Sequence, residues 1–192
     1  MRRTSFLLLI TVAVIISPLS AQSSGAGDAS FAIEDFALIE NVSKKRIQLM
    51  MSVKELENSL GKPEKVTAFP KPQQKDSKWD VIEYSYSGLK VHFARGWPEI
   101  YSIEANVDSY RTRRGIRIGS KKTEVMEKYG ERYLHPFPQE GWIVYAVVFE
   151  KPNLTVSRRW NLTNYDEIGS FLGLLSFEIE NDRVIRIAID RE

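Results

Sequence analysis

The sequence contains no cysteine and only two histidines, and both shortages exclude classes of chemistry. Without cysteine there is no disulfide, no thiolate nucleophile and none of the commonest structural zinc sites. The histidines, His92 and His135, are far apart in the chain and have no pattern of paired carboxylates nearby. We therefore predict no metal site and no cofactor, and a fold that depends on its hydrophobic core alone.

Motifs that carry catalysis are scarce as well. A Walker phosphate loop needs four residues between its glycines and then Lys-Ser/Thr, whereas three residues separate Gly115 from Gly119 and Ser120 precedes Lys121. No nucleophile-elbow motif is present. A Ser–His–acid triad is a spatial arrangement and needs no such motif. We predict a protein that is not an enzyme and assign no catalytic residue.

The longest apolar run, from Phe6 to Ile16, stands near the N-terminus behind Arg2 and Arg3. It is shorter than the roughly 20 residues that span a bilayer, and small residues follow it up to Ala21, as signal peptidase requires. We predict a signal peptide at residues 1–21, with an uncleaved anchor as the alternative, and no transmembrane helix in the mature chain. The protein is thus expected to be exported, periplasmic or secreted, and export without disulfides favours a bacterial envelope.

An excess of charge of one sign is also missing once the signal peptide is removed. The chain has 27 basic and 25 acidic residues, and two of the basic ones belong to residues 1–21. This balance gives no general attraction for nucleic acid, and we predict no such partner. The local exception is a basic cluster at residues 111–122, which predicts peripheral contact with an anionic surface. The alternative is a solvated loop whose charges are balanced by Glu124 and Glu127.

Two segments of equal length, residues 47–61 and 116–130, superimpose without a gap at an offset of 69. Each is predicted to contain a helix of roughly nine residues that ends at a glycine. In the first segment Ser52 and Glu55 form a capping-box pattern. In the second, Lys121 stands at the position of Ser52, so we expect Ser120 to cap the helix. Identical pairs are Ile47/Ile116, Glu55/Glu124 and Gly61/Gly130.

Three alternating segments follow each helix and predict strands. Ser87-Gly88 and Asn181-Asp182 are typical of tight hairpin turns between them. The sequence therefore predicts an α+β fold of two tandem modules, each a short helix (or helix pair) packed on an antiparallel β-meander. The modules span 44–110 and 111–192, after a flexible leader and N-terminal extension at 22–43. The expected strands are 79–87, 89–94, 100–107, 142–150, 174–180 and 183–190.

This pattern resembles the beta-lactamase-inhibitor-protein-like fold, which is shared with small outer-membrane assembly lipoproteins. Relatives typically read "LxxGMS…V…LGxP", and "IQLMMSVKELENSLGKP" (47–63) follows this with Met50 in place of the glycine. Residues 116–130 keep the glycine, but Glu131 follows where "xP" is expected, and the chain lacks the lipoproteins' cysteine. The resemblance implies an exported, non-enzymatic protein that binds other proteins through an open sheet face. Only framework positions match, so it transfers no inhibitor residue.

We accordingly predict a protein-binding or cell-envelope-associated factor that acts through open β-sheet faces. Strand parity turns Lys90, His92, Glu104 and Arg186 away from the helices, and Trp97, in the predicted turn "RGWPEI", is an exposed anchor. One alternative is an envelope hydrolase with a cleft between the modules. Another is a structural envelope protein without a defined partner. The predicted partner-binding residues are Trp97, His92, Lys90, Glu104, Arg186, Arg111, Arg113, Arg114 and Arg117.

Overall fold

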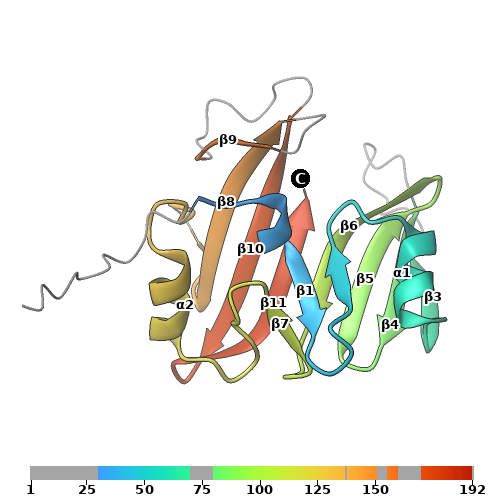
Figure 1. The fold of residues 1–192 in the computed structure, drawn as a ribbon, viewed down its shortest axis with the longest axis horizontal. Helices are drawn as coiled ribbons and strands as arrows, with labels where there is room; N and C mark the ends of the chain where they lie inside the picture. Colours follow the sequence, from blue (N-terminus) through green and yellow to red (C-terminus); the bar gives the residue numbers. More distant parts are fainter. Residues whose placement is uncertain (1–29, 70–79, 137, 151–154, 160–169, 192) are drawn as a thin grey trace, which may run out of the picture.

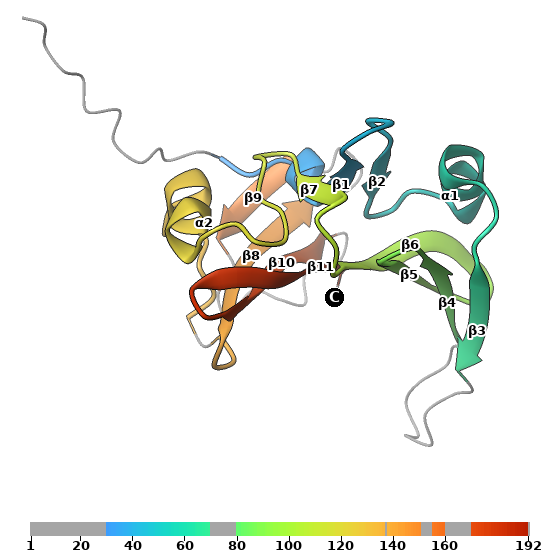
Figure 2. The ribbon, with the colours of Figure 1, turned by 90° about the horizontal axis from the view of Figure 1, so that it is seen from below.

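The protein is described by a computed structural model that covers residues 30–69, 80–136, 138–150, 155–159 and 170–191. Within these residues, strands predominate and form two antiparallel sheets, with two α-helices and one short 3-10 helix. The predicted α+β class is confirmed. Both α-helices and the smaller sheet lie on one side of the larger sheet (Figures 1 and 2). The predicted signal peptide and residues 22–29 of the leader lie outside the described residues.

The larger sheet has eight strands in the order β3-β4-β5-β6-β11-β10-β8-β9. Six of these strands correspond to the six predicted ones, and β3 and β9 are additional edge strands. The first half of the sheet comprises β3 (Lys65–Phe69), β4 (Val81–Tyr86), β5 (Leu89–Ala94) and β6 (Trp97–Ala105). The second half comprises β8 (Trp142–Glu150), β9 (Thr155–Arg159), β10 (Ser170–Glu180) and β11 (Arg183–Arg191).

Both predicted hairpin turns are present. Asn181 and Asp182 have φ angles of 49° and 61°, the left-handed pair that a type I′ turn requires. Gly88 has a φ of 69°, and a Cβ atom there would lie 2.3 Å from Cγ1 of Val107. Both turns therefore depend on residues that tolerate positive φ, and the Gly88 turn also needs the missing side chain.

The two helices, α1 (Val53–Leu60) and α2 (Lys122–Tyr129), begin and end at positions 69 residues apart. At α1, the Ser52 N–H donates to the Glu55 carboxylate at 2.8 Å, and the Glu55 N–H donates to Ser52 Oγ at 3.2 Å, which confirms the capping box. The prediction of Ser120 as the second cap is wrong, because Lys121 is the N-cap and its N–H donates to Glu124 at 3.0 Å. These α-helices of the described chain are too short to cross a membrane.

The backbone before the two helices is also equivalent. Met50 and Gly119 both have positive φ, at 65° and 88°. Met50 N–H donates to the Ile100 carbonyl at 2.9 Å, and Gly119 N–H donates to the Val184 carbonyl at 2.8 Å. Gly119 thus serves the backbone turn into the helix. The halves differ at their edges, because β3 precedes β4 whereas β9 follows β8, and their origin as tandem copies stays a prediction.

The two halves meet where β6 pairs with β11. Ile103 faces Ile189, and Ala105 faces Ile187, on either side of the central pair of Glu104 and Ala188. The four residues that flank this central pair are at most 1% exposed. The halves therefore share one sheet and one core rather than forming two separate sheets.

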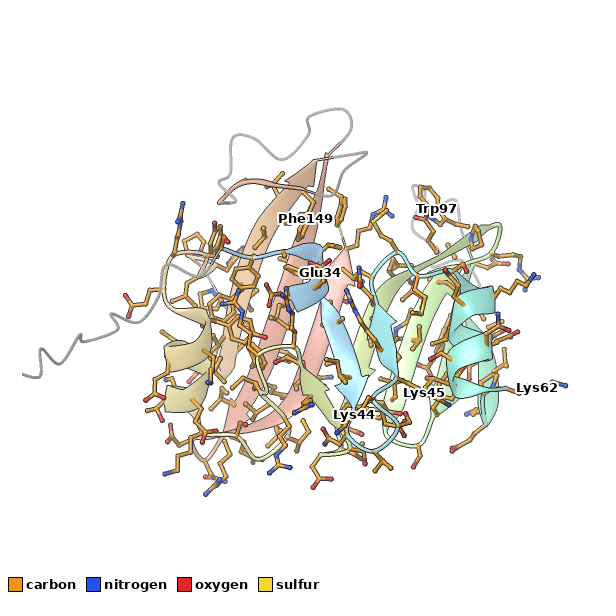
Figure 3. All side chains as sticks on the ribbon, in the orientation of Figure 1. Glu34, Lys44, Lys45, Lys62, Trp97 and Phe149 are labelled. Atoms are coloured by element: carbon orange, nitrogen blue, oxygen red, sulfur yellow. The ribbon has the colours of Figure 1, made fainter. Side chains whose placement is uncertain are left out.

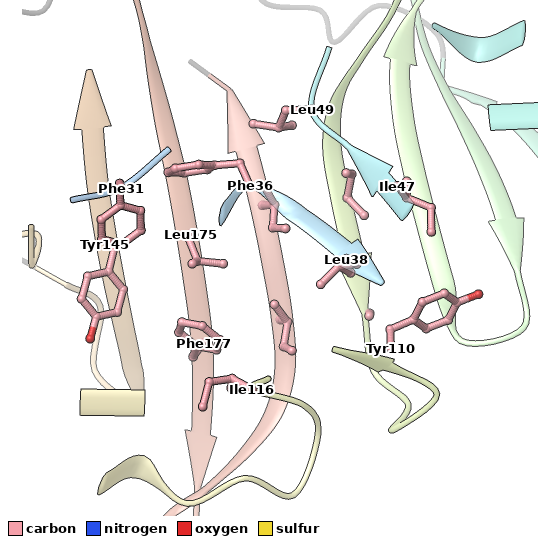
Figure 4. Packing of buried hydrophobic residues seen from close by; sticks show 14 of the residues in the cluster. Phe31, Phe36, Leu38, Ile47, Leu49, Tyr110, Ile116, Tyr145, Leu175 and Phe177 are labelled. Atoms are coloured by element: carbon pink, nitrogen blue, oxygen red, sulfur yellow. The ribbon is translucent and has the colours of Figure 1, made fainter. Parts of the chain in front are cut away.

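A three-stranded sheet in the order β2-β1-β7 lies over this junction on the helix side (Figures 1 and 2). It comprises β1 (Ala37–Glu40), β2 (Arg46–Gln48) and β7 (Tyr110–Thr112), and a 3-10 helix, η1 (Ile33–Asp35), precedes β1. Leu38 and Ile47 of the small sheet are fully buried against the larger one (Figure 4). Phe31, Phe36, Ala37 and Leu38 of the N-terminal extension are therefore part of the core.

Aromatic rings fill the core under the second half of the sheet. Phe31 packs on Tyr145, with ring centroids 5.6 Å apart (Figure 4). Phe36 meets Phe149 edge-on at 5.0 Å. Gly173 of β10 faces these rings, and a Cβ atom there would lie 2.7 Å from Phe149 and 2.9 Å from Phe36. A side chain at Gly173 would therefore displace the aromatic packing.

We expect Gly173→Ala to lower the free energy of unfolding by about 1–3 kcal/mol, because the methyl group overpacks this core. The measurement is urea unfolding followed by circular dichroism. Ser176→Ala, on the opposite face of the same strand, is the control and should have a smaller effect. Equal stability of wild type and Gly173→Ala would contradict the packing of Phe36 and Phe149 described above.

Candidate protein-binding face

The face of the larger sheet that points away from the helices, here called the open face, carries four of the predicted partner-binding residues. Alternation along β5 buries Leu89 and Val91 and turns Lys90 and His92 to the open face. Glu104 lies directly opposite Lys90 on β6. Arg186 of β11 lies on the same face, two residues from Ala188, which pairs with Glu104. The structure thus brings together residues from both halves.

Glu83 of β4 is the centre of a polar cluster on the open face. His92 Nε2 lies 3.2 Å and Lys90 Nζ 3.5 Å from Glu83 Oε2, and Ser85 Oγ donates to Glu83 Oε1 at 3.0 Å. Burial acts to raise the pKa of the Glu83 carboxyl. The hydrogen bonds from Ser85 and His92 and the charge of Lys90 outweigh burial, and they hold that pKa below its ordinary value. Glu83 is therefore ionised at neutral pH.

Arg186 is held by three groups around its guanidinium. Its Nε donates to Glu178 at 2.8 Å, its Nη1 lies 3.8 Å from Glu104, and its Cζ lies 4.8 Å from the centre of the Trp142 ring. Charges of opposite sign thus alternate across the open face from Glu83 to Glu178. A hollow of about 290 Å³ lies beside them, lined in part by Ser85, Lys90, Glu104 and Arg186.

Trp97 does not join this group. It is the first residue of β6 rather than part of the predicted turn, because residues 97–100 already pair in the sheet. The residue is 42% exposed at the rim of the sheet (Figure 3), and the Arg191 guanidinium lies 5.3 Å from the centre of its ring. Arg191 also lies 5.0 Å over Phe171 and donates to Glu99 at 3.2 Å. Trp97 is therefore an exposed aromatic side chain that a cation holds in place.

The structure separates the four predicted arginines of the basic cluster. Arg114 lies inside the protein, where its Nε donates to Asp35 Oδ1 at 2.9 Å and its Nη2 donates to Asp35 Oδ2 at 3.0 Å. Its guanidinium is stacked between the rings of Phe31 and Tyr129, at 4.8 and 4.7 Å. Burial acts to lower the pKa of Arg114, but the Asp35 carboxylate outweighs burial and raises it. Arg114 therefore stabilises the fold and offers little surface to a partner.

The other three arginines lie nearer the surface on the helix side. Arg113 is exposed and stands 3.8 Å from Glu34. Arg111 of β7 is partly exposed and pairs through its backbone with Arg117. Glu124, expected as a balancing charge, instead accepts from the Lys121 N–H at the start of α2. The basic cluster is thus divided between the interior and the surface.

One row of residues on the open face has the composition of a catalytic triad. Glu83, His92 and Ser102 are successive cross-strand neighbours on β4, β5 and β6, an acid–histidine–serine order. Among the described residues, no hydrogen bond joins His92 to Ser102, and no group of three or more acidic or histidine side chains could hold a metal. The hollow beside Lys90 contains neither His92 nor His135. Glu83 and Ser102 are themselves only 8% and 6% exposed.

Sequence reasoning missed several residues of these surfaces. Glu83 alternates with Ile82 and Tyr84, so strand parity could have placed it on the open face. Glu178 and Trp142 join Arg186 only through strand register, which the sequence does not display. Arg46 of β2 lies opposite Ile39, whose other neighbour is Arg111. No local pattern connects Arg46 with an arginine 65 residues away.

Comparison with known proteins adds little to this geometry. No protein-family model matches the chain, and no curated protein matches it. One solved structure is similar, an extracellular protein containing a SCP domain from Bacillus anthracis, with 9% sequence identity and a TM-score of 0.41. The match covers 85% of this chain and 47% of that one, so this chain spans about half of that protein. At this similarity, neither fold family nor activity transfers to this chain.

The Asp35–Arg114 pair allows a first prediction at this site. We expect Asp35→Ala to destabilise the protein by about 3–5 kcal/mol, because the mutation leaves the buried guanidinium of Arg114 without its counter-ion. Chemical denaturation measures this loss. Glu34→Ala is the matched control, since Glu34 is the neighbouring residue in an exposed ion pair with Arg113, and it should cost less than about 1 kcal/mol. Similar losses in both variants would contradict the buried pair.

The Glu83 cluster predicts a pH dependence of stability. The pKa of Glu83 in the folded protein lies below its ordinary value of 4.5, so the ionised carboxylate adds stability above that pH. The contribution is lost as pH falls through the folded pKa. We expect Glu83→Gln to flatten the decline in unfolding free energy between neutral and acidic pH, measured by urea unfolding at a series of pH values. Glu140→Gln, at an exposed position, should leave the decline unchanged. An unchanged pH profile in Glu83→Gln would refute the role of the cluster.

Proposed function

We propose that this protein is an exported, non-enzymatic factor of a bacterial cell envelope, periplasmic or secreted, and that it binds a protein partner through the open face. The observation that carries this proposal is the charged group on that face. Lys90 and Glu104 come from one half of the sheet, and Arg186, Glu178 and Trp142 come from the other.

The composition of the open face supports protein binding. Arginine and tryptophan are enriched among the residues that dominate protein–protein interfaces, and Arg186 lies directly over Trp142. Alternating charges fix the register and the identity of a partner more than they add affinity. Within the described residues, both helices and the small sheet lie on the opposite side (Figure 2). The side chains of Lys90 and Arg186 are 53% and 39% exposed. A partner with complementary charges fits this surface.

The order of elements supports the suspected resemblance to beta-lactamase-inhibitor-like proteins. Each half places one short helix before its strands, and β6 and β11 join the halves into one eight-stranded sheet. In the proposed scheme the halves are tandem copies of one module, as the shared bonds of Met50 and Gly119 suggest. Signal-peptide cleavage after Ala21 completes the scheme.

A hydrolase is the second candidate, and the observation that favours it is the row of Glu83, His92 and Ser102. It ranks below protein binding because Ser102 is only 6% exposed and the row lies outside the hollow beside Lys90. General-base catalysis needs the histidine within hydrogen-bond reach of the nucleophile. Covalent labelling of Ser102 by a fluorophosphonate would reverse this ranking.

The proposal is tested by crosslinking the processed protein in an envelope extract and identifying its partner by mass spectrometry. A saturable partner is expected. We expect the double variant Lys90→Glu/Arg186→Glu to weaken its binding by at least about tenfold, because both charges of the central group are reversed. Affinity is then measured by calorimetry with the purified partner.

The matched control is Lys54→Glu/Lys62→Glu, which reverses two exposed charges on and after α1 (Figure 3 labels Lys62). This variant changes the net charge equally and should retain wild-type affinity. The absence of any saturable partner would count against protein binding. An equal loss in both double variants would show that net charge, rather than the open face, determines the affinity.

A further inference from the structure

The outer face of the small sheet carries a row of arginines that come from distant parts of the chain. Arg46 lies opposite Ile39, and Ile39 lies opposite Arg111. Arg117 forms an isolated antiparallel bridge with Arg111 and extends the row. Because Leu38, Ile47 and Thr112 occupy the alternate positions and are fully buried, this row points away from the core. We call Arg46, Arg111 and Arg117 the arginine row.

Within the described part of the chain, no member of the arginine row forms an ion pair with a carboxylate. Arg46 donates to the side-chain oxygen of Gln48, a neutral group. Of the acidic residues on η1 and β1, Glu34 is paired with Arg113, and Glu40 accepts a hydrogen bond from Ser43. Unlike the charges of the open face, those of the arginine row meet no carboxylate among the residues that the structure describes. An anionic partner would supply the missing counter-charge.

The turn between β1 and β2 carries two further cations and an exposed aliphatic side chain. Lys44 and Lys45 are exposed there (Figure 3), and Val42 is 90% exposed, the most exposed of the large hydrophobic side chains described. An aliphatic side chain at the tip of a turn, with lysines two and three residues away, can enter the headgroup region while the cations meet phosphates. Guanidinium groups add paired hydrogen bonds to phosphate oxygens.

We propose that the arginine row, with Val42, Lys44 and Lys45, docks this protein on a bilayer that exposes anionic phospholipid headgroups. A lipid surface fits better than single-stranded nucleic acid, because no aromatic side chain lies in the row to stack on bases. It fits better than an acidic protein, because the exposed apolar residue is an aliphatic turn tip rather than an aromatic anchor. Docked in this way, the protein presents its open face away from the membrane (Figure 2).

The test is co-sedimentation of the processed protein with vesicles of phosphatidylcholine, with and without phosphatidylglycerol. Binding is expected only with phosphatidylglycerol and should decline as salt is added. We expect Arg46→Gln/Arg111→Gln/Arg117→Gln to lower the partition coefficient about a hundredfold, since each basic residue near an anionic surface contributes about fivefold. Because Arg111 is partly buried, Lys44→Gln/Lys45→Gln provides a second, fully exposed variant, with an expected loss of about twentyfold.

The matched control is Lys54→Gln/Lys62→Gln/Lys65→Gln. These three exposed lysines lie on and after α1, and their substitution removes as much charge as the arginine-row variant does. It should retain nearly all binding. Equal binding to both kinds of vesicle, or equal loss in the control and the arginine-row variant, would overturn the proposal. Binding to soluble polyglutamate that depends on the arginine row, without binding to vesicles, would make the partner an acidic protein and would also overturn it.

Discussion

The short ladder between β6 and β11 is the contact on which the rest of the structure depends. Four residue pairs join the halves there, and the buried pairs Ile103–Ile189 and Ala105–Ile187 place both cores under one sheet. Without this ladder each half would be a small sheet with one eight-residue helix, which is a marginal core. The same ladder aligns Lys90 and Glu104 with Arg186, so the proposed binding surface exists only because the halves share a sheet.

The buried arginine Arg114 determines how the small sheet is placed on the helix side of the molecule. Arg114 comes from the segment between the halves, and it is paired with Asp35 between two aromatic rings. This pair fixes the N-terminal segment and hence β1, the central strand of the small sheet. With β1 in place, Arg46 and Arg111 become neighbours across Ile39. A buried charge that serves the fold therefore sets the spacing of Arg46 and Arg111, which we assign to a lipid surface.

The two faces thus differ in how their charges are satisfied. On the open face, carboxylates and cations alternate and neutralise one another, as in a surface that selects a partner by pattern. On the outer face of the small sheet, the arginine row has no carboxylate partner in the described chain, as in a surface that meets a diffuse anionic charge. Because the faces point in opposite directions, a protein partner and a bilayer could be engaged together.

The sequence by itself determined the elements whose signals are local. Capping residues, terminal glycines and strand alternation located both helices and six strands of the large sheet, because each signal lies within a few residues of the element it defines. The cap of α2 was misassigned, since backbone geometry rather than side-chain type places the N-cap at Lys121. Only the tertiary structure decided which elements pair. Strands of three to five residues, such as β1, β2, β3, β7 and β9, show too little alternation to be recognised. The pairing of β7 with β1 also joins segments that lie far apart in the chain. For the same reason, the burial of Arg114 and the meeting of Arg46 with Arg111 follow from long-range packing and have no local trace in the sequence.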